Sequence, residues 1–139
     1  RQMPEVKFVF AGFGKAVEEI EKVPNAEYVG FKTGEELNRL IANATVTVYP
    51  SEWYENCPYS VMESLLLGTP VVGADIGGIP ELIRPGETGE LFESGNRTQL
   101  ADKLYSVIRN ADYYTENCKS VEFETPKTYY QKLFKIYGE

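Results

Sequence analysis

The sequence predicts an α/β protein in which helices cover both faces of a parallel sheet. Short apolar runs rich in Val and Phe read as buried strands. They alternate with longer segments whose apolar residues recur every three or four positions, which is typical of helices. Strands that alternate with helices in this way favour a parallel sheet, because each helix returns the chain to the same end of the sheet.

The first strand and helix of this pattern lie at the start of the chain. The run VKFVFA (residues 6–11) predicts a buried strand. It ends at Gly12 and Gly14, which favour either a tight turn alone or a turn that lies close to a phosphate. Residues 15–22 follow as a short helix.

The second strand and helix have a clearer boundary between them. Residues 28–29 form a brief strand before a glycine. Thr33 and Glu36 then match a capping box, in which a threonine side chain and a glutamate three residues later bond each other's amides. The apolar face of the helix that follows consists of Leu37, Leu40, Ile41 and Ala44.

The third strand–helix unit contains the most polar loop. Residues 45–49 (TVTVY) predict a strand, and residues 50–58 a loop rich in acids and aromatic rings. Pro58 suits the first turn of a helix, where its missing N–H would have no partner. This helix is rich in Leu and Val on more than one face, so we expect it to be largely buried. Gly68 suits its C-terminal cap.

The remaining elements continue the alternation. We expect a strand at residues 71–74, a glycine turn at 75–78, a short helix at 79–83 and a last strand at 89–92. Two helical stripes then follow, Leu100, Leu104, Val107 and Ile108, and later Tyr130, Leu133, Phe134 and Tyr137. We expect the tyrosines of this last segment to lie in the core or in a domain contact.

Residues 1–139 therefore predict one Rossmann-like domain with three layers, α/β/α. Sheets of this kind bind ligands at the carboxyl ends of their strands. The chain has 139 residues, enough for one core, with 42% apolar and 25% charged residues.

Charge and composition exclude several kinds of function. The net charge of −7 argues against nonspecific nucleic-acid binding. No apolar run approaches the roughly 20 residues that a membrane helix needs. The chain has no histidine, which excludes His triads and His metal ligands. Cys57 and Cys118 are too few for a disulfide framework or a zinc site, so we expect reduced thiols in a cytoplasmic protein.

The segment ENCPYSVMESLLLGTPVV places Glu55 and Glu63 on either side of a helix start. At such a junction, backbone amides can face a phosphate and carboxylates can face hydroxyls. The residues around this pair form an ordered series: Pro50-Ser51, Glu55, Glu63-Ser64, Gly68-Thr69-Pro70-Val71-Val72 and Gly77-Gly78-Ile79-Pro80-Glu81.

This series resembles the C-terminal, nucleotide-sugar-binding domain of the retaining glycosyltransferases of family 4 (glycosyl transferases group 1), which have the GT-B fold. The family pattern is Pro-Ser, a spacer, Glu, seven residues, Glu, then Gly-x-Pro-Val-Val and Gly-Gly-x-x-Glu. The start AGFG and the segment GETGELF are also similar to the family's. The resemblance covers about residues 6–104 in the right order and spacing.

The resemblance implies a role for each matching residue. Glu63 would accept hydrogen bonds from the ribose diol, since a carboxylate has two acceptor oxygens. Glu55 would do the same for the transferred sugar and is the candidate catalytic residue. The helix opening would hold the diphosphate, and the loop after the second strand would meet the base. The further binding residues expected are Asn56, Cys57, Pro58, Tyr59, Ser60, Gly12, Phe31 and Lys32.

The reaction that the resemblance implies is transfer of a hexose from a nucleotide-diphosphate sugar, such as a UDP-sugar, to a saccharide or lipid-linked acceptor. The leaving diphosphate takes the acceptor proton, and neither a metal nor another cofactor is expected. Stabilising that diphosphate would then carry most of the catalysis. Polysaccharide biosynthesis is the expected setting.

The family's diphosphate-binding Arg and Lys are expected upstream of residue 1, together with an acceptor-binding N-terminal domain of the same polypeptide. We therefore expect the chain by itself to be inactive and to bind a nucleotide sugar weakly. Peripheral membrane association would occur through that other domain.

Two alternatives stay open, a nucleotide-sugar epimerase of the GT-B type and a non-catalytic nucleotide-binding module. Such epimerases typically require histidines, which the chain lacks. A plain nucleotide-binding module would not need a sugar-facing Glu55 beside a ribose-facing Glu63.

Overall fold

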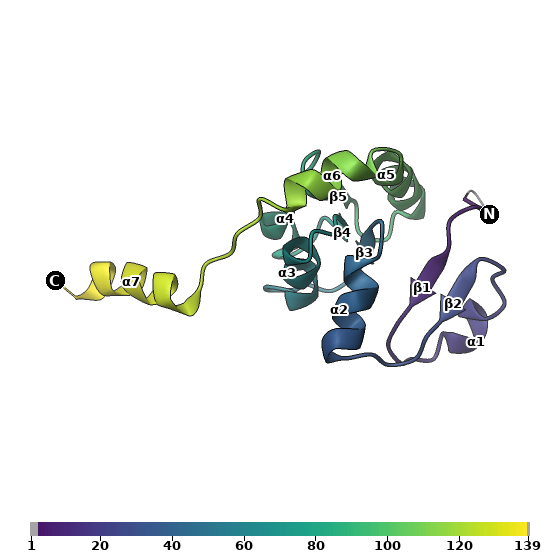
Figure 1. The fold of residues 1–139 in the computed structure, drawn as a ribbon, viewed down its shortest axis with the longest axis horizontal. Coiled ribbons are helices and arrows are strands. Elements are labelled where there is room, and N and C mark those ends of the chain that lie inside the picture. The colour runs from purple at the N-terminus through teal and green to yellow at the C-terminus, as the bar shows by residue number, and fades with distance from the viewer. Residues whose placement is uncertain (1–2, 139) are drawn as a thin grey trace. The chain divides into compact units, whose positions relative to one another are not determined.

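The computed structural model describes residues 3–138 and divides into two compact units, residues 1–44 and residues 45–139. Each unit contains strands and helices in alternation (Figure 1). Every pairing between its named strands is parallel. The predicted α/β class with parallel pairing is therefore confirmed.

The first unit contains a two-stranded sheet and two helices. Strand β1 (Phe8–Phe10) pairs in parallel with β2 (Ala26–Tyr28). Helix α1 (Val17–Ile20) connects them and contacts β2, and α2 (Gly34–Ala42) follows β2.

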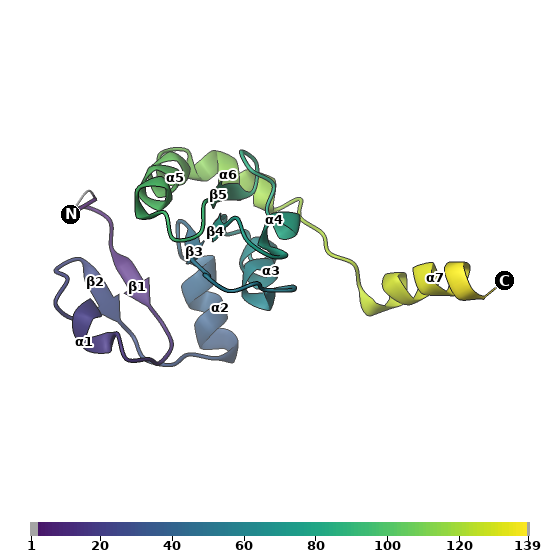
Figure 2. The ribbon, with the colours of Figure 1, turned by 180° about the vertical axis from the view of Figure 1, so that it is seen from behind.

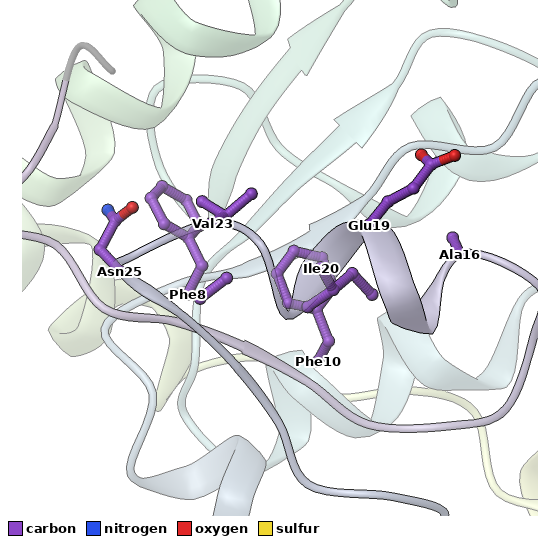
Figure 3. Close-up of a pocket in the computed structure, with 8 residues that line it drawn as sticks. Phe8, Phe10, Ala16, Glu19, Ile20, Val23 and Asn25 are labelled. Carbon is purple, nitrogen blue, oxygen red and sulfur yellow. The ribbon is translucent and has the colours of Figure 1, made fainter.

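The prediction that the first strand is buried is wrong within this unit. The Val9 side chain is 46% exposed and that of Phe10 is 42% exposed. The reason is that α1 has only four residues and cannot cover a sheet face. It leaves an open hollow of about 430 Å³ in which Phe8, Phe10, Ile20 and Val23 face one another (Figure 3).

Helix α2 begins where the sequence predicts, and its cap differs in detail. Thr33 is the N-cap residue, but its side chain makes no capping hydrogen bond, so the predicted capping box is not formed. The expected apolar face is confirmed, since its members are half-buried and most residues around them are exposed. These members are Leu37, Leu40, Ile41 and Ala44.

The second unit is built on a three-stranded parallel sheet. Its order is β3 (Thr47–Tyr49), β4 (Val71–Ala74) and β5 (Gly89–Phe92). All four residues of the central strand β4 are buried. Gly89 must be a glycine because a Cβ there would lie 1.9 Å from the carbonyl oxygen of Val71 on β4.

Helices cover this sheet on both faces. Helix α3 (Tyr59–Leu66) packs against β4 and against α4 (Ile79–Leu82). Helix α5 (Arg97–Arg109) packs on β4 and β5, on the side of the sheet away from α3 (Figures 1 and 2). Leu65 of α3 and Val107 of α5 are fully buried in the two resulting layers of the core.

A buried polar network fixes helix α6 (Ala111–Cys118) to the sheet. The Glu90 carboxylate on β5 accepts hydrogen bonds of 2.7 Å from both Lys103 and Tyr114. Burial by itself raises the pKa of Glu90, but these two donors outweigh it and hold the pKa below its usual value. Burial and the same carboxylate raise the pKa of Tyr114 to about 12, so the phenol stays a donor.

Helix α7 (Pro126–Tyr137) begins at a true N-cap, where the Thr125 hydroxyl accepts the amide of Thr128 at 3.2 Å. The predicted helix is confirmed, but a core position for its tyrosines is not. Tyr130 is 65% exposed and Tyr137 is 80% exposed, and α7 has no buried residue. Among residues 3–138, no helix has both the length and the apolar character needed to span a membrane.

Candidate functional site

The loop between β3 and α3 begins at the carboxyl end of β3 and carries most of the predicted site. Ser51 shapes its start, because the Ser51 hydroxyl accepts the amide of Trp53 at 3.1 Å. The hydroxyl of Ser94, just after β5, donates to the Ser51 carbonyl at 3.0 Å. These contacts hold the loop at the sheet edge where ligands bind in this class of fold.

Gly77 and Gly78 hold the next part of the same loop in place. The Gly78 amide donates to the Glu55 carbonyl at 2.7 Å. A Cβ at Gly78 would lie 1.8 Å from the Asn56 carbonyl oxygen, and one at Gly77 would lie 2.4 Å from that of Glu55. Gly77 also has φ of +59°, which side-chain-bearing residues rarely adopt. The glycine pair therefore allows the two backbones to touch, and this contact positions Glu55.

The Glu55 side chain is half-buried and has polar neighbours of its own. The Ser51 hydroxyl donates to Glu55 Oε1 at 3.5 Å. Tyr49, the last residue of β3, is in polar contact with Glu55 and with the hydroxyl of Ser60. Burial raises the pKa of Tyr49, the Ser60 contact lowers it, and the Glu55 carboxylate raises it further. The net effect keeps the phenol protonated at neutral pH.

The N-terminus of α3 presents backbone donors between Glu55 and Glu63. Pro58, predicted to lie in the first turn of this helix, is its N-cap residue, and it is buried. No capping side chain bonds this turn, and among residues 3–138 the amides of Tyr59 and Ser60 have no partner. Because these N–H groups and the helix dipole point outward together, the turn can accept an anion such as a diphosphate.

Glu63 lies on the exposed side of α3. The expectation that this helix is largely buried is only partly right. Val61, Ser64 and Leu65 form the buried stripe, whereas Leu66 is 58% exposed. The Glu63 side chain has no hydrogen bond or ion pair with any residue from 3 to 138. Its carboxylate is therefore exposed and available to a ligand.

Three predicted site residues, Gly12, Phe31 and Lys32, belong to the first unit. The Gly12 amide donates to the Gly30 carbonyl at 2.9 Å, which joins the loops after β1 and β2. Gly12 has φ of +133°, so this turn requires a glycine. Lys32 lies 3.7 Å from Glu36 in a partly exposed ion pair. The structure thus brings Gly12 and Phe31 to neighbouring loops of one unit.

Two residues of the candidate site were not predicted from the sequence. The sequence predicts Tyr49 only as the end of a strand. Its position directly before the polar loop is the signal that would place it at the site. Phe13, which lies between the two glycines of AGFG, is 84% exposed, and its ring centroid lies 5.5 Å from that of Phe31. An exposed aromatic pair beside the loop expected to meet a base is consistent with stacking against a flat ring.

The structure also locates the cysteines and tests for clustered metal ligands. Both Cys57 and Cys118 are free thiols, the first exposed and the second buried. Burial raises the pKa of Cys118 to about 11, which makes it unreactive. Residues 3–138 contain no group of three or more His, Cys, Asp or Glu side chains placed to hold a metal ion.

Comparison with known proteins assigns a family to this arrangement. The family profile described as Glycosyl transferases group 1 matches residues 1–110. The chain is 33% identical over 132 residues to the sulfoquinovosyl transferase SQD2 of Arabidopsis thaliana, covering 91% of this chain and 26% of that protein. It is 37% identical over 78 residues to the amylovoran biosynthesis glycosyltransferase AmsK of Erwinia amylovora, covering 52% of this chain and 19% of that protein.

A solved structure has the same fold over nearly the whole chain. The Anabaena protein Alr3699/HepE in complex with UDP matches with a TM-score of 0.80 at 19% identity, covering 98% of this chain and 42% of that one. Its complex with UDP-glucose matches with a TM-score of 0.79 at 22% identity and the same coverage. The matched regions therefore span about a fifth to two fifths of the length of these relatives.

Proposed function

Because the chain belongs to the glycosyl transferases group 1 family, we propose that it is the donor-binding part of a retaining glycosyltransferase. The donor is a nucleoside-diphosphate hexose, and the acceptor is a saccharide or lipid-linked hydroxyl. The observation that carries this proposal is the α3 turn, where two partnerless amides lie between the two acids of the predicted motif. Similarity to proteins named for glycosyl transfer supports it.

The proposed donor contacts follow from the chemistry of each group. The diphosphate takes hydrogen bonds from the amides of Tyr59 and Ser60 and lies at the positive end of the helix dipole. The exposed Glu63 carboxylate accepts from the ribose diol, as a two-oxygen acceptor can. Glu55, held at a fixed backbone position by Gly78, accepts from hydroxyls of the transferred sugar.

In the proposed reaction, the acceptor oxygen bonds to the anomeric carbon on the face from which the diphosphate leaves. The bond from that carbon to the diphosphate breaks, and the acceptor proton passes to the leaving diphosphate oxygen. The α3 amides stabilise the charge that develops on this group, which is where a catalyst of this kind acts most. A histidine base is not needed, in keeping with the composition of the chain.

Binding of the acceptor is assigned to a part of the whole protein outside this chain. SQD2, AmsK and HepE are each longer than the matched region. We propose a role in polysaccharide assembly on the similarity to AmsK, whose name refers to amylovoran biosynthesis.

A titration of the 139-residue chain monitored by two-dimensional NMR tests this function. Adding UDP-glucose should shift the amide signals of Tyr59 and Ser60, while UMP, which lacks the second phosphate, should shift them less. We expect weak binding, with a dissociation constant above the micromolar range. Unchanged Tyr59 and Ser60 signals at millimolar UDP-glucose would contradict the proposal.

A further inference from the structure

Helix α7 has two chemically different faces along its whole length. Side chains three and four positions apart lie on the same face of a helix. One face of α7 consists of Tyr129, Tyr130, Leu133, Phe134, Ile136 and Tyr137. The opposite face consists of Lys127, Thr128, Gln131, Lys132 and Lys135. The helix is therefore strongly amphipathic, with apolar and aromatic side chains on one face and basic and polar side chains on the other.

The apolar face of α7 is largely open to solvent. Phe134 is 60% exposed and Ile136 is 69% exposed, and no residue of the helix is buried. The rings of Tyr130 and Phe134 lie side by side, with their centroids 6.1 Å apart. Exposed apolar side chains that gather on one face mark a surface for contact with another molecule or with a membrane.

The polar face of α7 is basic. The helix has three lysines and no acidic residue, although the whole chain has a net charge of −7. Lys132 forms an ion pair with Glu124, just before the helix. Within residues 3–138, the side chains of Lys127 and Lys135 have no ion pair or hydrogen bond. These two charges are free to meet a negative surface, which the rest of this acidic chain does not favour repelling.

The two faces together fit the surface of a bilayer better than a groove in a protein. A protein groove takes up the apolar face of such a helix and leaves its polar face in solvent. A bilayer that contains anionic lipids uses both faces, because apolar side chains enter the headgroup region while lysines meet the phosphates. Half of the apolar face consists of tyrosines, whose apolar ring and polar hydroxyl suit the boundary between lipid and water.

We propose that α7 is an interfacial helix that binds the surface of a bilayer containing anionic lipids. It lies on that surface and does not cross it, since it has only 12 residues. The sequence led us to expect membrane association only through another domain, and α7 provides a contact within this chain. The inference does not depend on the donor site, because α7 contains none of its residues. One short helix without a lipid anchor binds reversibly.

Co-sedimentation of the 139-residue chain with vesicles tests this inference. We expect binding to vesicles of equal parts phosphatidylcholine and phosphatidylglycerol, and affinity for pure phosphatidylcholine lower by about tenfold or more. The double variant Lys127→Gln, Lys135→Gln should lose about ten- to thirtyfold in affinity for the anionic vesicles. Lys15→Gln, Lys22→Gln is the matched control, because it removes the same charge from exposed lysines of the first unit. It should bind as wild type does.

A second double variant, Phe134→Gln, Ile136→Gln, tests the apolar face. It should lose vesicle binding but keep the wild-type unfolding midpoint, because neither side chain is buried. No binding of wild type to the anionic vesicles, or equal losses in the two lysine variants, would overturn the inference. A wild-type dimer that Phe134→Gln, Ile136→Gln separates, without vesicle binding, would also overturn it, since a second copy of the chain would then cover this face.

Discussion

Glu55 and Glu63 belong to one short motif, but the structure holds them in opposite ways. Glu55 is half-buried in a loop whose backbone is pressed against Gly77 and Gly78. Glu63 is exposed on a regular helix, and its side chain has no partner among residues 3–138. One acid is therefore positioned by packing between distant segments, and the other by helix geometry alone. Substitutions should therefore affect them by different routes.

The largest expected effect comes from breaking the contact that positions Glu55. In Gly78→Ala the new Cβ would lie 1.8 Å from the Asn56 carbonyl oxygen, so the loop or the turn must move. We expect a loss of about 1–3 kcal/mol in unfolding free energy, and loss of UDP-glucose binding. Thermal unfolding followed by circular dichroism measures the first effect.

Gly14→Ala is the matched control for that substitution. A Cβ at Gly14 meets no atom within 4 Å, and its φ is not positive. Its unfolding midpoint should stay close to wild type. A Gly78→Ala variant as stable as Gly14→Ala, with normal binding, would show that the glycine contact does not position the loop.

Glu90, unlike Glu55 and Glu63, is an acid whose hydrogen bonds serve the fold. Glu90→Gln should lower the free energy of unfolding at pH 7 by about 1.5–3 kcal/mol, because it loses charge-assisted bonds from Lys103 and Tyr114. The pKa of Glu90 is held below its usual value in the folded state. Its stabilisation is thus full above the unfolded pKa of about 4.3 and is lost as the pH falls through the lower folded value.

Urea unfolding at pH 7 and at pH 3 measures this pH dependence. The difference in unfolding free energy between wild type and Glu90→Gln should be smaller at pH 3. Glu116→Gln serves as control, since that side chain is 72% exposed in its pair with Lys119. It should change stability by less than about 0.5 kcal/mol.

Glu55→Gln should resemble this control in stability. A loss as large as that of Glu90→Gln would mean that the neighbours of Glu55 serve the fold.

The smallest expected effect on stability belongs to Glu63. Because its side chain is exposed and without a partner, Glu63→Ala should leave the unfolding midpoint nearly unchanged. It should nevertheless weaken the binding of UDP by about tenfold or more, because the ribose hydroxyls lose their hydrogen bonds to a charged acceptor. Isothermal calorimetry or NMR titration with UDP measures this, and unchanged UDP affinity would remove Glu63 from the site.

Local patterns in the sequence were sufficient to predict much of this molecule. The predicted strand at residues 71–74 and the predicted glycine cap after α3 agree with the structure. Both features depend mainly on residues that are adjacent in the sequence. The order of Glu55, the helix start and Glu63 was also predicted correctly. The roles of these residues stay predictions.

What could not be predicted depends on contacts between distant segments. The close approach of Gly78 to Asn56 and the contact of Tyr49 with Glu55 need the folded positions of three elements. The exposure of Phe10 reflects how little of β1 the four-residue helix α1 can cover. A capping box at Thr33 satisfies a sequence pattern, but its hydrogen bond depends on a rotamer that no pattern fixes.

In the proposed function, Glu55 contacts the sugar and Glu63 contacts the nucleotide. This is tested by comparing the UDP and UDP-glucose affinities of Glu55→Ala and Glu63→Ala with those of the wild-type chain. Glu63→Ala should lower the affinity for both ligands by the same factor, whereas Glu55→Ala should lower the affinity for UDP-glucose alone. Equal effects of Glu55→Ala on UDP and UDP-glucose would contradict this division of roles.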